Sequence, residues 1–508
     1  MIAITESAVC SGIQACPVQV EVDVTTGLPQ MIVVGLPDTG VKESRERVRS
    51  AIKNSGFSFP PDKITINLAP ADLRKEGSAF DLPMALGILA ASEQIPQEKV
   101  TPYIFLGELA LDGSLRPIKG AIVIAESLKQ QRALVLPEEN AREAALEKRA
   151  RIYGARNLRD VVDFLKGDKP LSRTLSPEQD SNLGTPSGVP DFNEVKGQFM
   201  ARRAAEIAAA GGHNLLMLGS PGSGKTMLAR RIPGILPPLD FEQALEITKI
   251  YSIAGLGRGS YETLVKTRPF RDPHHSVSAA AMAGGGSWPK PGEISFAHGG
   301  VLFLDELPEY RRDVIETLRA PLEEGSVSIS RAKSQAVYPC RFMLVAAMNP
   351  CPCGFLTDPG RKCRCSLMQI KKYQSRVSGP ILDRIDLHVE VPALTYQMIT
   401  DETKAESSEV IRARVIACRA IQQERFSKKS RLLNAFMRPR DIKLFASPDQ
   451  AGKKLLESAM RDLHLSARGY FKILKIARTI SDLAGCEEIR SEHIAEAIQY
   501  RSLDRQWG

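Results

Sequence analysis

The sequence predicts an α/β fold made of an N-terminal α/β domain, a central α/β domain and a C-terminal helical domain. In the central part, an apolar run at 214–218 and an amphipathic run from 227 enclose a glycine-rich loop. A second apolar run at 300–304 ends in two acidic residues. From about residue 405 onward, apolar residues recur at helical spacing. Strands followed by such loops and helices are typical of a parallel sheet.

Composition describes an ordinary soluble protein with about three domains. The chain has 508 residues, of which 43% are hydrophobic and 25% charged. We see no apolar stretch long enough to span a bilayer and no signal-peptide pattern, so we expect a cytoplasmic protein without a membrane partner. Nine cysteines without a secretion signal indicate reduced thiols or a metal, and a net charge of +9 permits a nucleic-acid partner.

The predicted boundaries follow the change of pattern along the chain. Residues 1–168 form the first domain, with strands at 18–24, 31–34, 63–68 and 133–136 and helices around 41–54, 80–92 and 119–131. Residues 169–192 are rich in Pro, Gly, Ser and Asp, as in a linker. The central domain covers 193–393. The last, 394–508, has predicted helices at 409–425, 449–463, 470–483 and 491–501.

The glycine-rich loop is a complete G-x-x-x-x-G-K-T phosphate loop between a strand and a helix. Its backbone N–H groups and the following helix N-terminus suit phosphate groups. Lys225 is expected to reach the β- and γ-phosphates of ATP, and Thr226 to ligate Mg²⁺. The nucleotide-binding residues are Gly219, Ser220, Pro221, Gly222, Ser223, Gly224, Lys225 and Thr226.

Polar residues at the ends of two later strands complete this site. Asp305 is expected to hold Mg²⁺, and Glu306 to orient and deprotonate the attacking water. The alternative is a strand that ends in a solvated acidic turn. Asn349 follows a third strand, at 342–347, and suits a role in placing the lytic water near the γ-phosphate.

Two arginines are further candidates. Arg384 follows a helix-like turn, from which it could reach the γ-phosphate of a neighbouring subunit. The alternative is a surface pair with Asp383 or Asp386. Arg468 opens a C-terminal helix, from which it could lean over the nucleotide.

These motifs, in this order, resemble the ComM/YifB family of magnesium-chelatase-like AAA+ ATPases. The runs at 268–276, 291–295, 349–354 and 470–485 are also similar, and the resemblance covers essentially the whole chain. It implies an AAA+ core with a C-terminal helical lid, in which Lys225 and Thr226 belong to Walker A and Asp305 and Glu306 to Walker B. It further assigns Asn349 to sensor 1, Arg384 to the arginine finger and Arg468 to sensor 2. A homohexameric ring is implied, as is a DNA helicase that drives branch migration during natural transformation.

Residues between these motifs point to single-stranded or branched DNA. The passage from Lys225 to Asp305 is long, which predicts an insertion near 255–298. Alternating residues near 324–338 predict a hairpin with Arg331 and Lys333 at its turn. In the family such a hairpin points into the ring channel, where the two basic residues would follow a phosphate backbone. A solvated hairpin tip is the alternative.

Four cysteines follow Asn349 as two C-x-C pairs, Cys351 with Cys353 and Cys363 with Cys365. Four thiolates suit tetrahedral Zn²⁺, although the spacing is not the usual C-x-x-C. Reduced or redox-active thiols are the alternative.

The N-terminal domain resembles the Lon-type peptidase fold, which is ribosomal S5 domain 2-like. The serine position of that family falls on Ala79, with Ser78 one place off, and the lysine position falls on Ile122, with Lys119 out of register. Because both catalytic groups are needed, we interpret the domain as a noncatalytic scaffold that binds DNA or a partner. Two alternatives to a DNA motor remain, namely a magnesium-chelatase-type subunit that remodels a partner protein and an ATP-dependent protease.

Overall fold

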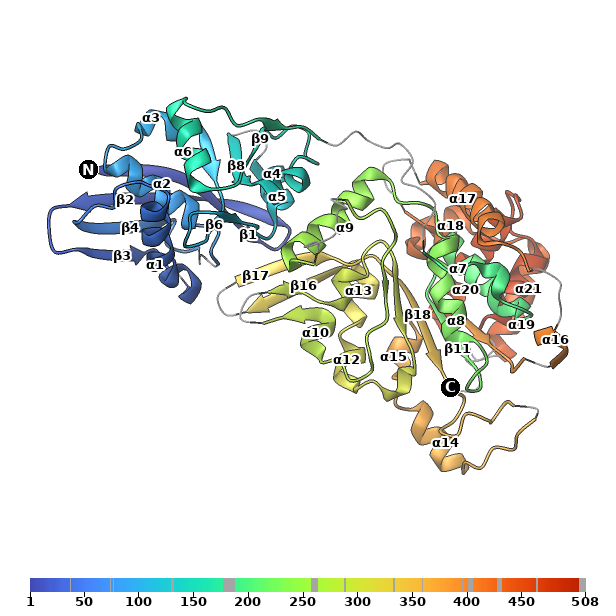
Figure 1. Cartoon of the computed structure of the whole chain (residues 1–508). Coiled ribbons are helices and arrows are strands. Elements are labelled where there is room, and N and C mark those ends of the chain that lie inside the picture. The colour runs from blue at the N-terminus through green and yellow to red at the C-terminus, as the bar shows by residue number, and fades with distance from the viewer. Residues whose placement is uncertain are drawn as a thin grey trace.

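The computed structural model describes residues 1–36, 38–73, 75, 77–128, 132–176, 188–256, 264–286, 289–331, 334–358, 360–394, 396–400, 405–426, 432–462 and 465–501. Figure 1 shows three regions in chain order, an N-terminal sheet with helices in blue and teal, a central sheet in green and yellow, and C-terminal helices in orange and red. The predicted linker at 169–192 is not wholly a linker, because Arg173 and Thr174 pair with Tyr153 and Ile152 in the sheet of the first region. Its residues 177–187 lie outside the described part.

The N-terminal region is built on an eight-stranded mixed sheet in the order β10-β9-β8-β5-β1-β2-β4-β3. Its strands are β1 (Ile2–Ser11), β2 (Gln14–Thr25), β3 (Gln30–Val34), β4 (Lys63–Ala69), β5 (Tyr103–Phe105), β8 (Ala133–Pro137), β9 (Ile152–Ala155) and β10 (Arg173–Thr174), with a separate β6–β7 pair (Glu108–Leu109, Leu115–Arg116). Its helices are α1 (Thr39–Asn54), α2 (Asp81–Ala91), α3 (Gln97–Val100), α4 (Ala121–Leu128), α5 (Glu138–Ala144) and α6 (Leu158–Lys166). All four predicted strands are present. The prediction missed β1, β5, β9 and β10 of this sheet.

The central region is a five-stranded parallel sheet in the order β12-β15-β18-β11-β19. The strands are β11 (Leu215–Leu218), β12 (Phe270–Arg271), β15 (Val301–Leu304), β18 (Met343–Met348) and β19 (Leu387–Glu390). β11, β15 and β18 are buried along their whole length, which explains their continuous apolar sequences, because helices cover both faces of such a sheet.

The helices of the central region connect these strands. They are α7 (Phe199–Gly211), α8 (Lys225–Ile235), α9 (Phe241–Ala254), α10 (Ala279–Ala283), α11 (Glu293–Phe296), α12 (Arg312–Glu316), α13 (Arg319–Glu324), α14 (Leu367–Gln374) and α15 (Gly379–Leu382), with 3-10 turns η1 (Phe192–Glu194) and η2 (Leu307–Glu309).

The passage at 255–298 is not wholly an insertion. Residues 270–271 form β12, which pairs with β15 and is therefore the edge strand of the main sheet. A short β13–β14 pair (Gly284–Gly285, Lys290–Pro291), α10 and α11 follow it. Residues 257–263 and 287–288 lie outside the described part. Sequence reasoning missed β12 because a two-residue strand leaves no periodic signal.

The predicted hairpin near 324–338 is confirmed. Strands β16 (Ser326–Arg331) and β17 (Ser334–Pro339) pair in antiparallel register, with Arg331 opposite Ser334. Val327, Ile329 and Tyr338 are buried in an apolar cluster that includes residues of β15 and β18. The body of the hairpin is thus fixed to the central region.

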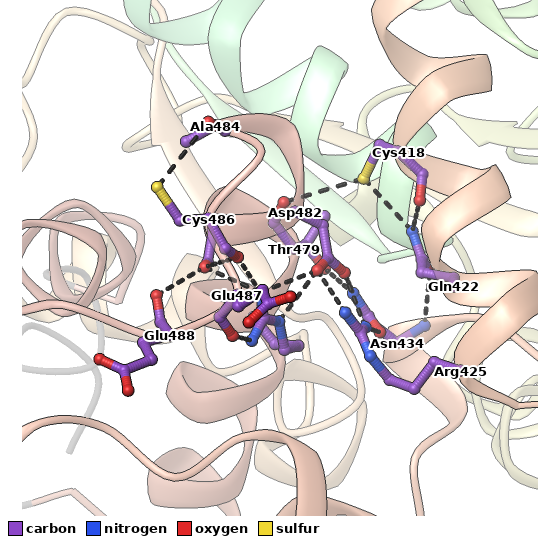
Figure 2. A network of polar contacts seen from close by, with 12 residues as sticks. Cys418, Gln422, Arg425, Asn434, Thr479, Asp482, Ala484, Cys486, Glu487 and Glu488 are labelled. Carbon is purple, nitrogen blue, oxygen red and sulfur yellow. Dashed lines mark hydrogen bonds and ion pairs between the residues drawn. The ribbon is translucent and has the colours of Figure 1, made fainter.

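The C-terminal region is helical, as predicted. It contains α17 (Ser408–Arg425), α18 (Pro439–Phe445), α19 (Gln450–Asp462), α20 (Ala467–Leu483) and α21 (Ser491–Gln499), together with η3 (Asn434–Phe436), and the short α16 (Tyr396–Thr400) precedes them. Figure 2 shows the buried polar network that joins α17, η3 and α20 around Asp482. Asp482 accepts hydrogen bonds from Arg425 and from Asn434 Nδ2 (2.8 Å). Because these groups are buried and mutually satisfied, the network fixes how the three elements pack.

The N-terminal and central regions share an apolar contact. Ile122 and Val123 of α4 pack with Leu239, Ala244 and Ile247 beside and along α9. Lys249 pairs with Glu126 at 2.6 Å at the edge of the contact. A second contact lies at the β1–β2 turn, where a Cβ on Gly12 would be 3.2 Å from Ala336 Cβ of β17.

Among the helices that the structure describes, none is both long enough and apolar enough to cross a membrane.

Candidate nucleotide site

The phosphate loop lies between β11 and α8, as predicted, at the carboxyl end of the sheet. Gly222 and Gly224 have φ values of +78° and +93°, which only glycine adopts at low cost. A Cβ on Gly219 would lie 2.2 Å from the carbonyl oxygen of Val391. The glycines therefore allow both the curvature of the loop and its close approach to the chain after β19.

The Lys225 ammonium lies inside this loop. Its Nζ donates to the carbonyl oxygens of Gly219 (2.7 Å) and Ser220 (2.9 Å) and to Asn349 Oδ1 (3.3 Å). Burial lowers the pKa of Lys225, while the charges of Asp305 and Glu306 act in the opposite direction. The predicted partners Lys225 and Asn349 are thus brought into direct contact.

Thr226 and Asp305 also meet. The Thr226 hydroxyl donates to Asp305 Oδ2 at 2.7 Å. Two hard oxygen donors side by side at the end of a strand are the ligand type that Mg²⁺ prefers. The residues present therefore fit the predicted metal.

Glu306 is held in an uncommon backbone conformation. Its φ is +50°, in the left-handed region, and its N–H donates to Asp305 Oδ1 at 2.9 Å. A non-glycine residue there costs about 1–2 kcal/mol, and such strain is frequent at functional sites. The side chain remains 56% exposed, so it is accessible to solvent at the mouth of the site.

His275 is a site residue whose place the sequence did not reveal. Its Nδ1 lies 4.0 Å from Glu306 Oε2, and its ring meets that of Tyr310 edge-on at 6.4 Å. One signal was available in the chain order. His275 follows β12, and the carboxyl end of β12 lies at the same edge of the sheet as the carboxyl end of β15.

The loop that carries the four cysteines, called the cysteine loop below, packs directly on the phosphate loop. Gly354 has a φ of +83°, and a Cβ on it would lie 2.4 Å from Cδ and 2.7 Å from Cγ of Pro221. Its N–H donates to the carbonyl oxygen of Cys351 at 3.0 Å. Spacing in the sequence does not reveal this contact, because Pro221 and Gly354 lie on different strand ends.

The four predicted cysteines form one cluster, with their sulfur atoms all within 4.8 Å of one another. Cys351 Sγ lies 3.4 Å from Cys353 Sγ and 3.7 Å from Cys363 Sγ. Backbone N–H groups of Phe355 and Arg364 lower the pKa of the Cys353 thiol to about 6, whereas burial raises the pKa of Cys351 to about 12. A tetrahedral zinc site with bonds of about 2.3 Å has sulfur–sulfur edges of about 3.8 Å, so the cluster fits that metal.

Arg384 lies at the opposite end of the sheet. Its carbonyl oxygen accepts from Asn214, the residue before β11, at 3.0 Å, and its guanidinium pairs with Glu323. The pair with Asp383 or Asp386 that we considered is therefore replaced by one with Glu323. Arg468 lies beside Arg384, since its Nη1 is 3.7 Å from Asp383 Oδ2. Both arginines thus lie away from the phosphate loop of their own chain.

The remaining predicted residues belong to the β16–β17 hairpin and to the N-terminal region. The Arg331 backbone ends β16, but its side chain and the whole of Lys333 lie outside the described residues. In the N-terminal region, Ser78 donates its hydroxyl proton to Glu108, and Ile122 is completely buried. The two positions therefore do not hold a serine and a lysine that could act together as a peptidase dyad.

Comparison with known proteins places this site in a family. Three family models match the chain. The model described as "Magnesium chelatase, subunit ChlI" matches residues 191–399, and the one described as "Magnesium chelatase, subunit ChlI C-terminal" matches residues 405–501. The model described as "Subunit ChlI of Mg-chelatase" matches residues 20–140. "Competence protein ComM" of Haemophilus influenzae is 46% identical over 99% of this chain and 98% of its own length. "Uncharacterized protein YifB" of Salmonella typhimurium is 44% identical over the same shares. A "Magnesium-chelatase 67 kDa subunit" of Chlorobaculum parvum is 27% identical over 31% of this chain and 23% of its own length. The chain therefore belongs to the ComM/YifB family of magnesium-chelatase-like proteins.

Proposed function

We propose that this protein is a cytoplasmic ATPase that forms a hexameric ring and moves along DNA, as a helicase that promotes branch migration during natural transformation. The observation that carries the ATPase part is the convergence of Lys225, Thr226, Asp305 and Asn349 from three strand ends on one phosphate loop. The DNA part is supported by the full-length similarity to a protein named for competence.

Thr226 and Asp305 are the residues that would hold Mg²⁺ with ATP. When bound, the ion supplies positive charge that offsets the charge developing on the phosphoryl oxygens. The Thr226 hydroxyl and the Asp305 carboxylate, 2.7 Å apart, are already side by side. Little rearrangement of either side chain is needed to present both oxygens to one ion.

Three side chains have roles in hydrolysis. Lys225, whose charge is stabilised by Asp305 and Glu306, neutralises the β- and γ-phosphate oxygens. Glu306 accepts a proton from the attacking water, and its exposure leaves room for that water. Asn349, which already contacts Lys225 at 3.3 Å, orients the water by its amide.

The position of Arg384 and Arg468 supports a site shared between subunits. Both lie at the amino end of the sheet, whereas the phosphate loop follows the carboxyl end of β11. In a ring, the amino end of one subunit can face the phosphate loop of the next. Arg384 would then leave Glu323 and stabilise the transition state on the neighbour's nucleotide.

The β16–β17 hairpin is the proposed DNA contact. Its body is anchored by buried Val327 and Ile329, so that movement of the central region moves the hairpin. Arg331 and Lys333 at its turn would contact phosphates without reading bases.

The cysteine cluster would hold a structural zinc ion. Its four sulfur atoms fit a closed tetrahedral site. A closed site leaves no position for substrate, so the ion would stabilise the loop that packs on Pro221 and take no part in hydrolysis.

A branch-migration assay tests the proposal. Purified protein is mixed with a labelled four-way DNA junction, with and without ATP, and both ATP hydrolysis and strand exchange are measured. We expect DNA-stimulated hydrolysis and ATP-dependent exchange, both lost in Lys225→Ala and Glu306→Gln. Glu309→Gln is the matched control, because Glu309 lies nearby but pairs with Arg376 on the surface at 2.8 Å. Normal ATP hydrolysis with no exchange on any branched substrate would rule out the helicase.

A second candidate is a magnesium-chelatase-type subunit that remodels a partner protein. The similarity of 166 residues to a magnesium-chelatase subunit favours it. It predicts ATP hydrolysis that responds to a protein partner and not to DNA, which the same ATPase assay distinguishes.

A further inference from the structure

A cavity of about 180 Å³ lies between the central region and the C-terminal helices. Gly300 and Met343, at the amino ends of β15 and β18, line it on one side, and Arg419 of α17 lines it on the other. It therefore lies at the end of the sheet opposite the phosphate loop. Among the predicted site residues that the structure describes, none lines it.

Arginines dominate the polar part of its lining. Arg268 and Arg341 come from the segments before β12 and β18, and Arg419 comes from the C-terminal region. Glu246 is the one carboxylate among the described lining residues, and its Oε2 lies 3.3 Å from His298 Nε2. Positive charge thus exceeds negative charge in a partly open space that is lined by two regions of the chain.

Two of the guanidinium groups are fixed by backbone carbonyl oxygens. Arg268 Nε donates to Pro237 O at 2.6 Å and its Nη1 donates to Gly299 O at 2.5 Å. Arg419 donates from Nε and Nη2 to Ala209 O, at 3.0 and 2.6 Å, near the end of α7. Carbonyl oxygens orient a guanidinium group but do not neutralise its charge. Each arginine therefore keeps a full charge in a set position.

This arrangement costs free energy without an anion. Burial and, to a smaller extent, the charge of Arg419 lower the pKa of Arg268 to about 9, although the charge of Asp240 acts in the opposite direction. Burial likewise lowers the pKa of Arg419 to about 10. An anion in the cavity would remove the repulsion between the two groups and offset their loss of hydration.

We propose that this cavity binds a phosphate-class oxyanion that bridges Arg268 and Arg341 of the central region and Arg419 of the helical region. Cavities that hold drug-sized ligands measure roughly 300–1,000 Å³, so this smaller one suits a single phosphate group and not a whole nucleotide. The phosphate is either a free ion or one group of a DNA backbone. By joining the two regions, it would restrict their relative movement.

Binding of inorganic phosphate to the full-length protein tests this proposal. Titration calorimetry is done in chloride buffer at constant ionic strength, in a Lys225→Ala background that disables the phosphate loop. Arg419→Gln removes the charge but keeps an amide that can donate to Ala209. Arg341→Gln spares the carbonyl contacts altogether, since Arg341 is exposed, and therefore tests the site even if Arg419→Gln does not fold. The control is Arg461→Gln on α19, whose side chain is 72% exposed.

We expect both cavity variants to weaken phosphate binding about tenfold or more, with no change in the control. Phosphate binding that the Lys225→Ala background already lacks, or that neither cavity variant affects, would overturn the proposal. Competition by a single-stranded oligonucleotide without terminal phosphates would identify the DNA backbone as the source of the phosphate, and its absence would identify the free ion. The result does not depend on helicase activity, so it can fail or hold separately from the proposed function.

Discussion

Replacing Gly354 by alanine should impair ATP hydrolysis although Gly354 is not expected to touch ATP. The added Cβ would lie 2.4 Å from Cδ of Pro221, far inside van der Waals contact. Pro221 belongs to the phosphate loop, and its ring cannot rotate away from the added Cβ. The phosphate loop or the cysteine loop must therefore move. Either movement separates two segments that now fit together.

The size of the effect can be worked out from two contributions. A left-handed alanine costs about 1–2 kcal/mol, and insertion of a methyl group into a packed contact costs about 1–3 kcal/mol. The first contribution affects folding alone. If the second displaces the phosphate loop from its catalytic position, kcat/KM for ATP falls roughly 5- to 160-fold.

Steady-state ATPase assays and thermal melting separate the two contributions. Gly167→Ala is the matched control, because Gly167 has a φ of +88° and no atom within 4 Å of the added Cβ. We expect both variants to melt at lower temperature and only Gly354→Ala to lose kcat/KM. Equal ATPase activity in the two variants would refute the coupling between the cysteine loop and the phosphate loop.

Three further predictions follow from the geometry. Removal of metal by a strong chelator should release about one zinc per chain, measured by elemental analysis, and lower the ATPase rate; a metal-free protein with full activity would contradict this. Arg384→Ala and Lys225→Ala should each be inactive, yet an equal mixture should regain hydrolysis at about a quarter of its sites if a ring shares them; an inactive mixture of well-formed rings would argue against sharing. Burial lowers the pKa of His213 to about 4. Between about pH 4 and pH 6.5, His213 is therefore neutral in the folded protein but protonated in the unfolded chain. Stability should thus be complete above about pH 6.5 and fall towards pH 4, by up to about 3 kcal/mol, and His213→Asn should reduce this dependence in melting experiments; an unchanged pH profile would assign it to other groups.

Strong local patterns made most of the fold predictable. The buried strands at 215–218 and 301–304 are continuous apolar runs, and the amphipathic α17, α19, α20 and α21 have clear helical periods. β1 was missed because Thr5, Glu6 and Ser7 interrupt its apolar residues. Tertiary contacts account for these exceptions, since Thr5 donates to Pro83 O at 3.0 Å and Glu6 pairs with Arg132 at 2.6 Å.

The site was predictable to the extent that its chemistry is written in motifs. Lys225, Thr226 and Asp305 follow strands that must end at one edge of a parallel sheet, so their proximity follows from topology. The pairing of Arg384 with Glu323 and the contact of His275 with Glu306 depend on how loops cross in space. No spacing in one sequence contains that information.

The packing of the first domain on α9 limits how the chain can be dissected in the laboratory. Cutting after residue 168 would expose Leu239, Ala244 and Ile247, which are now at most 3% exposed, and would also remove the turn that rests on Ala336. A truncated ATPase would therefore have an exposed apolar face that is prone to aggregation and an altered hairpin. Loss of activity on truncation would then say little about whether the first domain itself binds DNA. Point substitutions on its solvent-exposed surface are the informative approach.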